Sequence, residues 1–328
     1  MTKMNISKLK EIITNFRNKK ILIIGDIMLD EYIWGEIMRI SPEAPVPIVK
    51  VIKRSYALGG AGNTAANVAA LGGNPVLTGA IGKDQQAVIL IEELKKLQIS
   101  TNYMISHNHP TITKTRIIAQ DQQIIRIDVE QLDQLNVALE NKILRIALEQ
   151  IEYVQACVIS DYAKNIITDR VSKEIISTAR QFGVPIIVDP KGSYFLKYRN
   201  ATVVTPNIKE VEKFYNHDIT NEHEILHFAG KLKNLLHDSA ILITRGPEGM
   251  TLYLNESEIY NIISVARHLY DVTGAGDTVV SVFALSLASG ATLKQAAYIA
   301  NHAAGLVVEK IGTATVSFEE LLARINEK

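Results

Sequence analysis

The chain has 328 residues, 47% of them hydrophobic and 21% charged, which is enough for one large domain or two ordinary ones around an ample core. Lysine and arginine together number 35, and so do aspartate and glutamate, so the formal net charge is zero. Proteins that bind nucleic acid usually carry a basic excess, and this balance therefore gives no support to that class.

Targeting and redox features are few. The segment before Ile21 has basic residues but no apolar core, so we expect no signal peptide, and no apolar run is long enough to predict a membrane span. The single cysteine, Cys157, lies in an apolar stretch and is predicted to be a buried small hydrophobic residue. One cysteine cannot form an internal disulfide or a thiolate zinc site. These features are typical of the cytoplasm.

Short apolar runs that end in a polar residue recur along the chain and alternate with helical segments. An amphipathic helix is predicted over 7–17, and the apolar run 21–24 after it ends at Gly25 and Asp26. Similar runs predict buried parallel strands at 157–161, 185–189, 202–206 and 240–245. Helices are predicted near 137–150, 168–182, 208–215, 222–236, 276–289 and 293–310. The alternation predicts an α/β fold with a mainly parallel sheet flanked by helices, which binds ligands at the carboxyl ends of its strands.

Two segments break this alternation, at 31–57 and 102–130. The first alternates apolar and polar residues and contains three prolines, and the second has two β-like runs on either side of the polar turn 120–122. We expect antiparallel strands outside the main sheet, which form a small β-lid over the active site of a single domain, 1–328. Exposed lid strands leave unpaired edges, so we also expect a homodimer formed through the lid.

The stretch from Asp271 to Thr278 reads Asp-Val-Thr-Gly-Ala-Gly-Asp-Thr and is followed by an apolar, helix-like run. Gly274 and Gly276 allow a tight turn that a ligand can approach closely, and such a turn before a helix directs free amide N–H groups at an anion. Asp277 is well placed there to take a proton from a hydroxyl group that attacks the anion. The alternative is an ordinary N-cap aspartate, but two glycines, two aspartates and two threonines in eight residues favour a phosphoryl-transfer site.

Other nucleotide-binding motifs are absent or lack their context. Residues 60–65 fit the dinucleotide pattern GxGxxG/A, but no buried strand directly precedes them, so a dehydrogenase is not favoured. The sequence contains neither the GxxxxGK[ST] motif of P-loop enzymes nor the HRD catalytic loop of protein kinases.

The sequence resembles the PfkB or ribokinase-like family of carbohydrate kinases on two motifs. That family has DTxGAGD near its C-terminus, which 271–277 matches except that Val272 replaces threonine, and a glycine-rich segment near its N-terminus, which 59–68 matches. The resemblance covers essentially the whole chain. It implies a ribokinase-like fold and an ATP- and Mg²⁺-dependent phosphoryl transfer to a small hydroxylated substrate. Members often use a monovalent cation such as K⁺ near the anion-binding turn.

Further segments resemble those members of the family that act on heptose 7-phosphate in ADP-heptose synthesis. They are 25–30, 39–47, 114–120, 160–164, 188–192 and 205–207. The resemblance implies phosphorylation of D-glycero-D-manno-heptose 7-phosphate at the C1 hydroxyl, on the route to the lipopolysaccharide core. Such kinases are often fused to a nucleotidyltransferase with an HxGH motif, which the eight histidines here do not form, so we expect a stand-alone kinase or a kinase half. Asn165 stands where this resemblance leads us to expect glycine.

The resemblance and the chemistry of the residues assign roles at the anion-binding turn. Asp277 is the expected general base, and the amides of Gly274, Ala275, Gly276 and Asp277 are expected to hold the migrating phosphoryl group. An ordinary carboxylate is a weak base with a pKa of about 4, but the loose transition state of phosphoryl transfer depends more on positioning and charge than on early deprotonation.

Asn207 and Glu210 resemble the NxxE motif of the family, whose glutamate is tied to Mg²⁺ and phosphate through water. The alternative is a helix start with Asn207 as the cap and Glu210 at the third position. Thr244 and Gly246 lie at a strand end and are expected to line the nucleotide site. Asn301 is expected near the adenine, although an asparagine on an apolar helix is as often structural.

The sugar site is expected to use residues from both motifs and from strand ends. Asp26 and Asp30 are candidate acceptors for sugar hydroxyl groups, with Gly59, Gly60 and Asn63 closing on the substrate. A 7-phosphate requires cations, and the candidates are Lys191, Arg116, Lys114 and Arg39. Taken alone, each of these cations is more often a solvated surface charge. Another sugar or a nucleoside as substrate, and a non-catalytic sugar-binding regulator with the same fold, are the alternatives.

Overall fold

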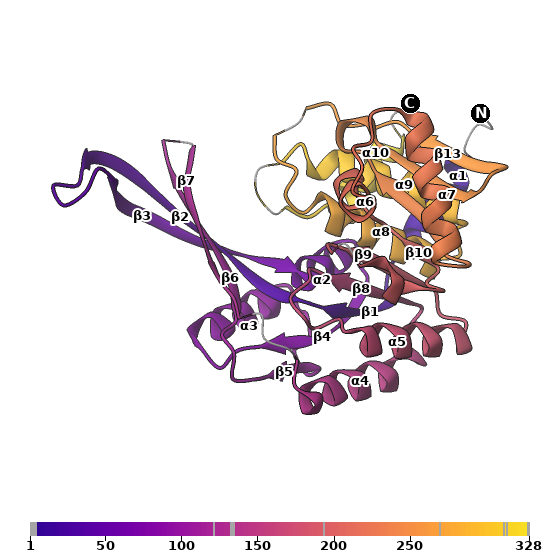
Figure 1. Ribbon diagram of the computed structural model, residues 1–328, viewed down its shortest axis with the longest axis horizontal. Coiled ribbons are helices and arrows are strands. Elements are labelled where there is room, and N and C mark those ends of the chain that lie inside the picture. The colour runs from indigo at the N-terminus through magenta and orange to yellow at the C-terminus, as the bar shows by residue number, and fades with distance from the viewer. Residues whose placement is uncertain are drawn as a thin grey trace.

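A nine-stranded main sheet forms the centre of the computed structural model, which describes residues 5–120, 122–131, 135–192, 194–268, 270–310, 312 and 314–326 (Figure 1). The strand order is β13-β12-β11-β10-β9-β8-β1-β4-β5. The strands are β1 (Lys20–Gly25), β4 (Asn74–Ile81), β5 (Met104–Ser106), β8 (Ala156–Asp161), β9 (Ile186–Pro190), β10 (Val203–Val204), β11 (Ala240–Thr244), β12 (Met250–Asn255) and β13 (Glu258–Ile262). Neighbours from β11 to β5 run parallel, and β12 and β13 continue the sheet as an antiparallel hairpin.

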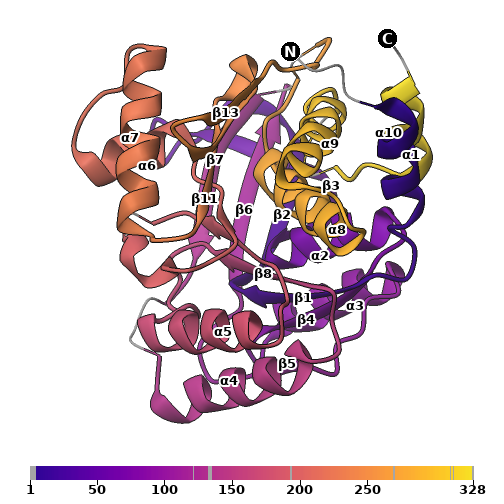
Figure 2. The ribbon, with the colours of Figure 1, turned by 90° about the vertical axis from the view of Figure 1, so that its right-hand side faces the viewer.

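Helices cover both faces of the main sheet, because alternate residues of its strands point into two different apolar layers (Figure 2). In β1, Ile21 and Ile23 belong to one layer and Leu22 and Ile24 to the other, and all four are buried. The first layer contains α1 (Ile6–Thr14), α2 (Ala61–Ala70), α3 (Gln85–Lys96), α8 (Ala275–Ala288), α9 (Leu293–Val307) and α10 (Phe318–Asn326). The second contains α4 (Val137–Ile151), α5 (Asp169–Gln181), α6 (Ile208–Tyr215) and α7 (Glu222–Leu235).

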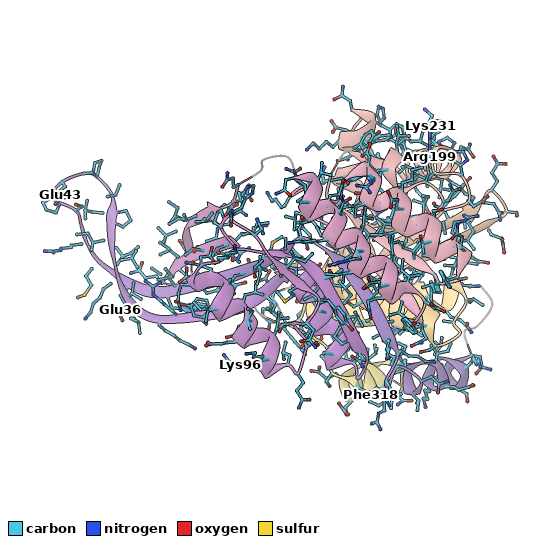
Figure 3. All side chains as sticks on the ribbon, turned by 90° about the horizontal axis from the view of Figure 1, so that it is seen from below. Glu36, Glu43, Lys96, Arg199, Lys231 and Phe318 are labelled. Atoms are coloured by element: carbon cyan, nitrogen blue, oxygen red, sulfur yellow. The ribbon has the colours of Figure 1, made fainter. Side chains whose placement is uncertain are left out.

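A second, four-stranded sheet projects from the body of the molecule (Figure 1). Its strand order is β3-β2-β6-β7, with β2 (Ile27–Ile40), β3 (Pro47–Gly60), β6 (Ile112–Ala119) and β7 (Gln122–Val129). The outer pairs are antiparallel, as predicted, and the middle pair of β2 and β6 is parallel. Figure 3 shows Glu36 and Glu43 toward the far end of this projection. We call these four strands the small sheet.

The start of the segment 102–130 does not belong to the small sheet, which differs from our expectation. Met104–Ser106 forms β5 and pairs in parallel with residues 79–81 of β4. The reason is topological, because the helix α3 between β4 and β5 makes a crossover that returns the chain parallel to β4 in the same sheet.

The predicted α/β architecture is confirmed, and most of the predicted elements lie close to their observed bounds. The helices predicted at 208–215 and 222–236 are α6 and α7, and Cys157 is buried in β8. The strand predicted at 202–206 is shorter, since only Val203 and Val204 pair with their neighbours. Among the described residues, no helix is both long enough and apolar enough to cross a membrane.

Candidate active site

Polar side chains gather where the parallel strands of the main sheet end, as the sequence predicts. Asp26 follows β1, Asp161 ends β8, and Asp189 lies near the end of β9. These three carboxylates are buried. Because β1, β8 and β9 are neighbours in the sheet, their carboxyl ends form one edge, and the first turn of α8 carries Asp277 to that edge.

The carboxylate of Asp277 is held by three donors from distant parts of the chain. Its Oδ2 accepts a hydrogen bond from Asn63 Nδ2 at 2.7 Å. Its Oδ1 accepts from the hydroxyl of Tyr162 at 2.9 Å and from that of Thr64 at 3.3 Å. Asp277 lies in the first turn of α8, after Gly274, whose φ of 82° is in the left-handed region that favours glycine.

Burial raises the pKa of Asp277 from its ordinary value of 3.8 to about 6, and the negative charge of Asp189 acts in the same direction. The positive charge of Lys191 and the hydrogen bonds from Asn63 and Tyr162 oppose this shift. The carboxylate is therefore a stronger base than an ordinary aspartate and is still mostly ionised at neutral pH. Both properties suit a group that accepts a proton from a hydroxyl near pH 7.

The turn between β3 and α2 positions Asn63. Gly60 has a φ of 56°, and a Cβ atom there would lie 2.3 Å from the carbonyl oxygen of Asp26. At Gly59, a Cβ atom would lie 2.7 Å from Oδ2 of Asp30. At Gly60 only glycine allows this close approach to backbone, whereas a Cβ at Gly59 would have to displace the side chains of Asp30 and Met28. Within α2, Asn67 donates to the carbonyl oxygen of Asn63 at 3.0 Å, which ties this turn of the helix together beside Asp277.

A cavity of about 640 Å³ opens beside Asp277, a size typical of small-molecule sites. At one end it is lined by Tyr162, Lys191 and the turn 274–277. Four residues predicted for the nucleotide also line it, namely Asn207, Thr244, Gly246 and Asn301. The structure therefore brings the predicted nucleotide residues and the anion-binding turn into one cavity.

Two of these residues also have clear local structural roles. Asn207 and Glu210 form a complete capping box at the start of α6, with Asn207 N–H donating to Glu210 Oε2 at 2.8 Å and Glu210 N–H to Asn207 Oδ1 at 2.9 Å. Asn301 Nδ2 donates to the carbonyl oxygen of Ile263 at 2.8 Å. The capping alternative raised by the sequence is thus present, and Oε1 of Glu210 remains directed toward Lys191, 3.9 Å from its Nζ.

Fewer backbone amides are available to form the predicted anion hole than we expected. The N–H of Ala275 donates to the carbonyl oxygen of Val272 at 3.2 Å, so this amide is already used. The N–H groups of Gly276 and Asp277 lie in the first turn of α8, where helical amides lack an intrahelical acceptor. Those two amides are the ones best able to bind an anion in the cavity.

Lys191 and three carboxylates form a charged cluster at the inner end of the cavity. Lys191 Nζ donates to Asp189 Oδ1 at 3.0 Å. Burial alone would lower the pKa of Lys191, but the charges of Asp189, Glu210 and Asp277 raise it above its ordinary value, so the ammonium stays protonated. Burial raises the pKa of Glu210 to about 7, although Lys191 opposes the shift. The cluster holds more acidic than basic groups.

The residues of this cluster fit a cation that is bound through water. Among the described residues, no three acidic, histidine or cysteine side chains converge closely enough to coordinate a metal ion directly. Oδ2 of Asp189 is nevertheless buried without a hydrogen-bond partner, and Glu210 lies close by across Lys191. Hard divalent cations such as Mg²⁺ prefer oxygen ligands and usually keep several waters.

Asp26 is fully buried, and its carboxylate is turned toward backbone amides, which does not support the prediction that it binds a sugar hydroxyl. Its Oδ2 accepts hydrogen bonds from the N–H groups of Tyr162 at 2.7 Å and Lys164 at 3.2 Å, and its Oδ1 from that of Ile166 at 3.3 Å. Burial, with the nearby charge of Asp161, raises the pKa of Asp26 to about 7. The enclosed carboxylate organises the loop after β8 by accepting from three of its backbone amides.

The small sheet contributes a second group of charged residues. Arg116 in β6 forms an ion pair with Asp30 in β2, and its guanidinium carbon lies 5.4 Å from the ring centre of Tyr32. Lys114 Nζ lies 5.7 Å from the ring centre of Tyr162, so this strand reaches the residues around Asp277. Arg39, also predicted as a cation for the 7-phosphate, is exposed toward the far end of β2 and is not brought to the site.

Tyr162 is the main site residue that sequence reasoning missed. The segment 160–164 supports the family resemblance, but it gave no role to the tyrosine, because only the fold brings its hydroxyl to Asp277. The same loop explains Asn165, which stands where glycine was expected. Its φ of 73° is in the left-handed region, which asparagine tolerates better than other non-glycine residues.

The chain is similar to curated proteins over most of its length. It is 41% identical over 323 residues to the bifunctional protein HldE of Geotalea uraniireducens, covering 98% of this chain and 66% of that protein. It is 44% identical over 312 residues to the bifunctional protein HldE of Shewanella sediminis, covering 95% of this chain and 64% of that protein. The chain thus spans about two thirds of the length of these relatives.

Solved structures share the fold at low sequence identity. Ribokinase of Arabidopsis thaliana, complexed with ribose and ATP, superposes with a TM-score of 0.75 at 18% identity, over 95% of this chain and all of that chain. Phosphofructokinase-2 of Escherichia coli, in complex with substrates and products, superposes with a TM-score of 0.75 at 20% identity, over 94% and 98% of the two chains. The predicted ribokinase-like fold is confirmed.

A sequence model described as pfkB family carbohydrate kinase matches residues 18–320. This match covers both motifs on which the resemblance was based, and it confirms the prediction of an ATP-dependent sugar kinase. The chain belongs to the pfkB family of carbohydrate kinases.

Proposed function

We propose that this chain transfers the γ-phosphoryl group of ATP to the C1 hydroxyl of D-glycero-D-manno-heptose 7-phosphate. The product is heptose 1,7-bisphosphate, an intermediate of ADP-heptose and lipopolysaccharide core synthesis. The observation that best supports this reaction is the buried, triply hydrogen-bonded carboxylate of Asp277 at the start of α8, beside a cavity of about 640 Å³.

Asp277 is the general base in this proposal. As the C1 oxygen attacks the γ-phosphorus, the hydroxyl proton passes to Asp277, and the bond between phosphorus and the bridging oxygen of ADP breaks. Oδ2 of Asp277 accepts one described hydrogen bond, from Asn63, and so has a lone pair for the sugar hydroxyl. The amides of Gly276 and Asp277 stabilise the negative charge of the transferred group.

The nucleotide occupies the cavity in this proposal. Asn207, Thr244, Gly246 and Asn301 line it beyond the anion-binding turn. Glu210 and Asp189 would hold Mg²⁺ through water, and the ion would neutralise charge on the phosphates. A monovalent cation such as K⁺ near the turn belongs to the proposal as well. One of the similar structures, phosphofructokinase-2 of E. coli, is described in complex with potassium.

The sugar phosphate lies between the small sheet and the anion-binding turn in this proposal. Asp30, Gly59, Gly60 and Asn63 border its C1 end, and Arg116 and Lys114 bind the 7-phosphate. Burial lowers the pKa of Lys114 although Asp30 opposes the shift, so an ammonium group there gains from a phosphate partner. Support for heptose comes from the family segments at 25–30 and 114–120, and from the 41% and 44% identity to the bifunctional protein HldE of two bacteria.

A substrate panel tests this proposal. ATP consumption is measured with heptose 7-phosphate, unphosphorylated heptose, a fructose phosphate, ribose and adenosine, and the product is located by phosphorus NMR. We expect turnover with heptose 7-phosphate and a new phosphate at C1. Turnover with another sugar but not with heptose 7-phosphate would show that the substrate assignment is wrong. Sugar binding without any turnover would favour a non-catalytic regulator.

We also propose a homodimer formed through the small sheet. All residues of β7 are exposed, and four of them are apolar, namely Ile124, Ile125, Ile127 and Val129. Val51 and Ile52 of β3 are exposed as well, at the other edge of the same sheet. Two unpaired edges and apolar surface on a projecting sheet (Figure 1) are features that a partner chain would cover.

A further inference from the structure

Lys191 lies where the main sheet, the cavity and the first turn of α8 meet. It directly follows β9, and its backbone N–H donates to the carbonyl oxygen of Asp161 at 2.8 Å, which fixes the start of the side chain. Its Nζ stands 3.3 Å from the position that a Cβ atom on Gly276 would occupy. The ammonium group therefore faces the backbone of the anion-binding turn.

The ammonium group of Lys191 has more N–H donors than described hydrogen bonds. Its described hydrogen bond goes to Asp189, and Glu210 lies beyond hydrogen-bond distance at 3.9 Å. An ammonium group carries three N–H donors. The side chain is 27% exposed and lines the cavity together with Asp277. The remaining donors are thus available to a ligand beside the turn.

We infer that Lys191 is a catalytic residue, which binds the non-bridging oxygens of the phosphoryl group as it passes from ATP to the sugar. The inference rests on the proposed function and adds a third element to its anion site, next to the amides of Gly276 and Asp277. Lys191 itself makes and breaks no covalent bond. Its positive charge stabilises the negative charge spread over the equatorial oxygens of the transferred group.

This role differs in its kinetics from the sequence-based expectation that Lys191 binds the 7-phosphate. A ligand of the 7-phosphate contributes to substrate binding, so its loss raises KM for the phosphorylated sugar. A ligand of the transferred group acts mainly in the transition state, so its loss lowers kcat and changes KM little.

The test compares the Lys191→Met variant with a Lys173→Met control, in which an exposed lysine of α5 is changed. We expect kcat of Lys191→Met to fall by about 10²–10³ while KM for the sugar stays within about threefold. Affinity for ADP alone should be kept, and the extra affinity for ADP with fluoroaluminate and sugar should be lost. A kcat near that of the control, or a raised sugar KM with kcat retained, would overturn the inference.

Removing Lys191 alone leaves the buried Asp189 without its partner, which can impair folding. The Asp189→Asn variant is therefore also compared with the double variant Asp189→Asn/Lys191→Met. We expect the double variant to lose at least about tenfold more kcat, whereas equal values would refute the role. Each comparison is a ratio of kcat values measured with any sugar that the unchanged protein phosphorylates. Failure of the heptose assignment is therefore distinguishable from failure of this inference.

Discussion

The hydroxyl of Tyr162 donates a hydrogen bond to Oδ1 of Asp277 at 2.9 Å, so residues 115 positions apart in sequence meet at one carboxylate. Thr64 donates to the same oxygen, whereas Oδ2 has Asn63 as its described donor. The two carboxylate oxygens therefore differ. Oδ1 accepts two described hydrogen bonds, and Oδ2 accepts one, which leaves Oδ2 a lone pair for a substrate hydroxyl.

This contact predicts the effect of Tyr162→Phe on the pH profile. The tyrosine donor favours the ionised form of Asp277, so its loss should raise the pKa of that carboxyl further above about 6. The base must be deprotonated, so activity is present above this pKa and is lost as the pH falls through it. We expect the acid limb of kcat/KM to move up by about one pH unit. Tyr194→Phe, which changes a half-exposed tyrosine, is the control. An unmoved limb in Tyr162→Phe would contradict the prediction.

Asp277→Asn should abolish most of the turnover while the nucleotide still binds. The asparagine keeps the shape of the side chain and can accept from Tyr162, but it cannot take the hydroxyl proton. We expect kcat to fall by a factor of about 10² or more. Steady-state kinetics and ADP titration measure the two effects, and near-normal turnover would exclude Asp277 as the base.

The Asp277→Asn variant should also have a higher free energy of unfolding than the unchanged chain, and the difference should depend on pH. The pKa of Asp277 is about 6 in the folded chain against an ordinary 3.8, so ionising it there costs folding free energy. The cost is absent below about pH 4, grows up to about pH 6 and is constant above. Asparagine avoids it, so the unfolding free energy should exceed that of the unchanged chain by about 1–3 kcal/mol at pH 7–8. Denaturant titrations at pH 4 and pH 8 check this, and a pH-independent difference would contradict it.

Part of the order of strands and helices followed from local patterns, and most candidate site residues followed from the family motifs, whereas β4, β12, β13, α2, α3 and α10 were not among the predicted elements. Ile21 to Ile24 are apolar because both faces of β1 are covered, and Gly274 and Gly276 are spaced for a turn into a helix. Contacts that form only in the tertiary structure could not be predicted from the sequence. The sequence alone could not show that Asp26 caps the amides of the loop after β8, or that Lys191 faces Gly276.

Gly60→Ala should destabilise the fold far more than Gly183→Ala. Both glycines have positive φ, 56° and 67°, which side chains of L-residues rarely adopt, so each alanine carries a backbone cost. At Gly60 the ψ of −133° lies outside the left-handed helical region as well, which adds to that cost. At Gly60 the added Cβ would also lie 2.3 Å from the carbonyl oxygen of Asp26, whereas at Gly183 no atom lies within 4 Å. We expect a loss of about 3 kcal/mol or more at Gly60, measured by denaturant unfolding. Equal losses would mean that the turn can shift.

Arg116→Gln should weaken binding of a phosphorylated sugar more than binding of its unphosphorylated analogue. If Arg116 binds the 7-phosphate, its loss should raise KM for heptose 7-phosphate by about tenfold or more, since a charge-assisted hydrogen bond contributes about 1.5–3 kcal/mol. Arg54→Gln is the control, because Arg54 is an ion-paired arginine of the same sheet on its opposite face by register. An equal rise in KM for both sugars would mean that Arg116 acts at the sugar end or by positioning Asp30.

Changing two residues of β7 should separate the proposed dimer. Ile125 and Ile127 are exposed on an edge strand, and charged residues there oppose edge pairing and apolar contact. We expect the unchanged chain to be a dimer by light scattering at micromolar concentration and Ile125→Lys/Ile127→Lys to be a monomer. Ile263→Lys, at an exposed position outside the small sheet, should remain a dimer. A monomeric unchanged chain would refute the dimer. If the double variant is still a dimer, the dimer contact does not involve β7. Two lysines on each copy of that strand would otherwise repel their counterparts across the symmetry axis.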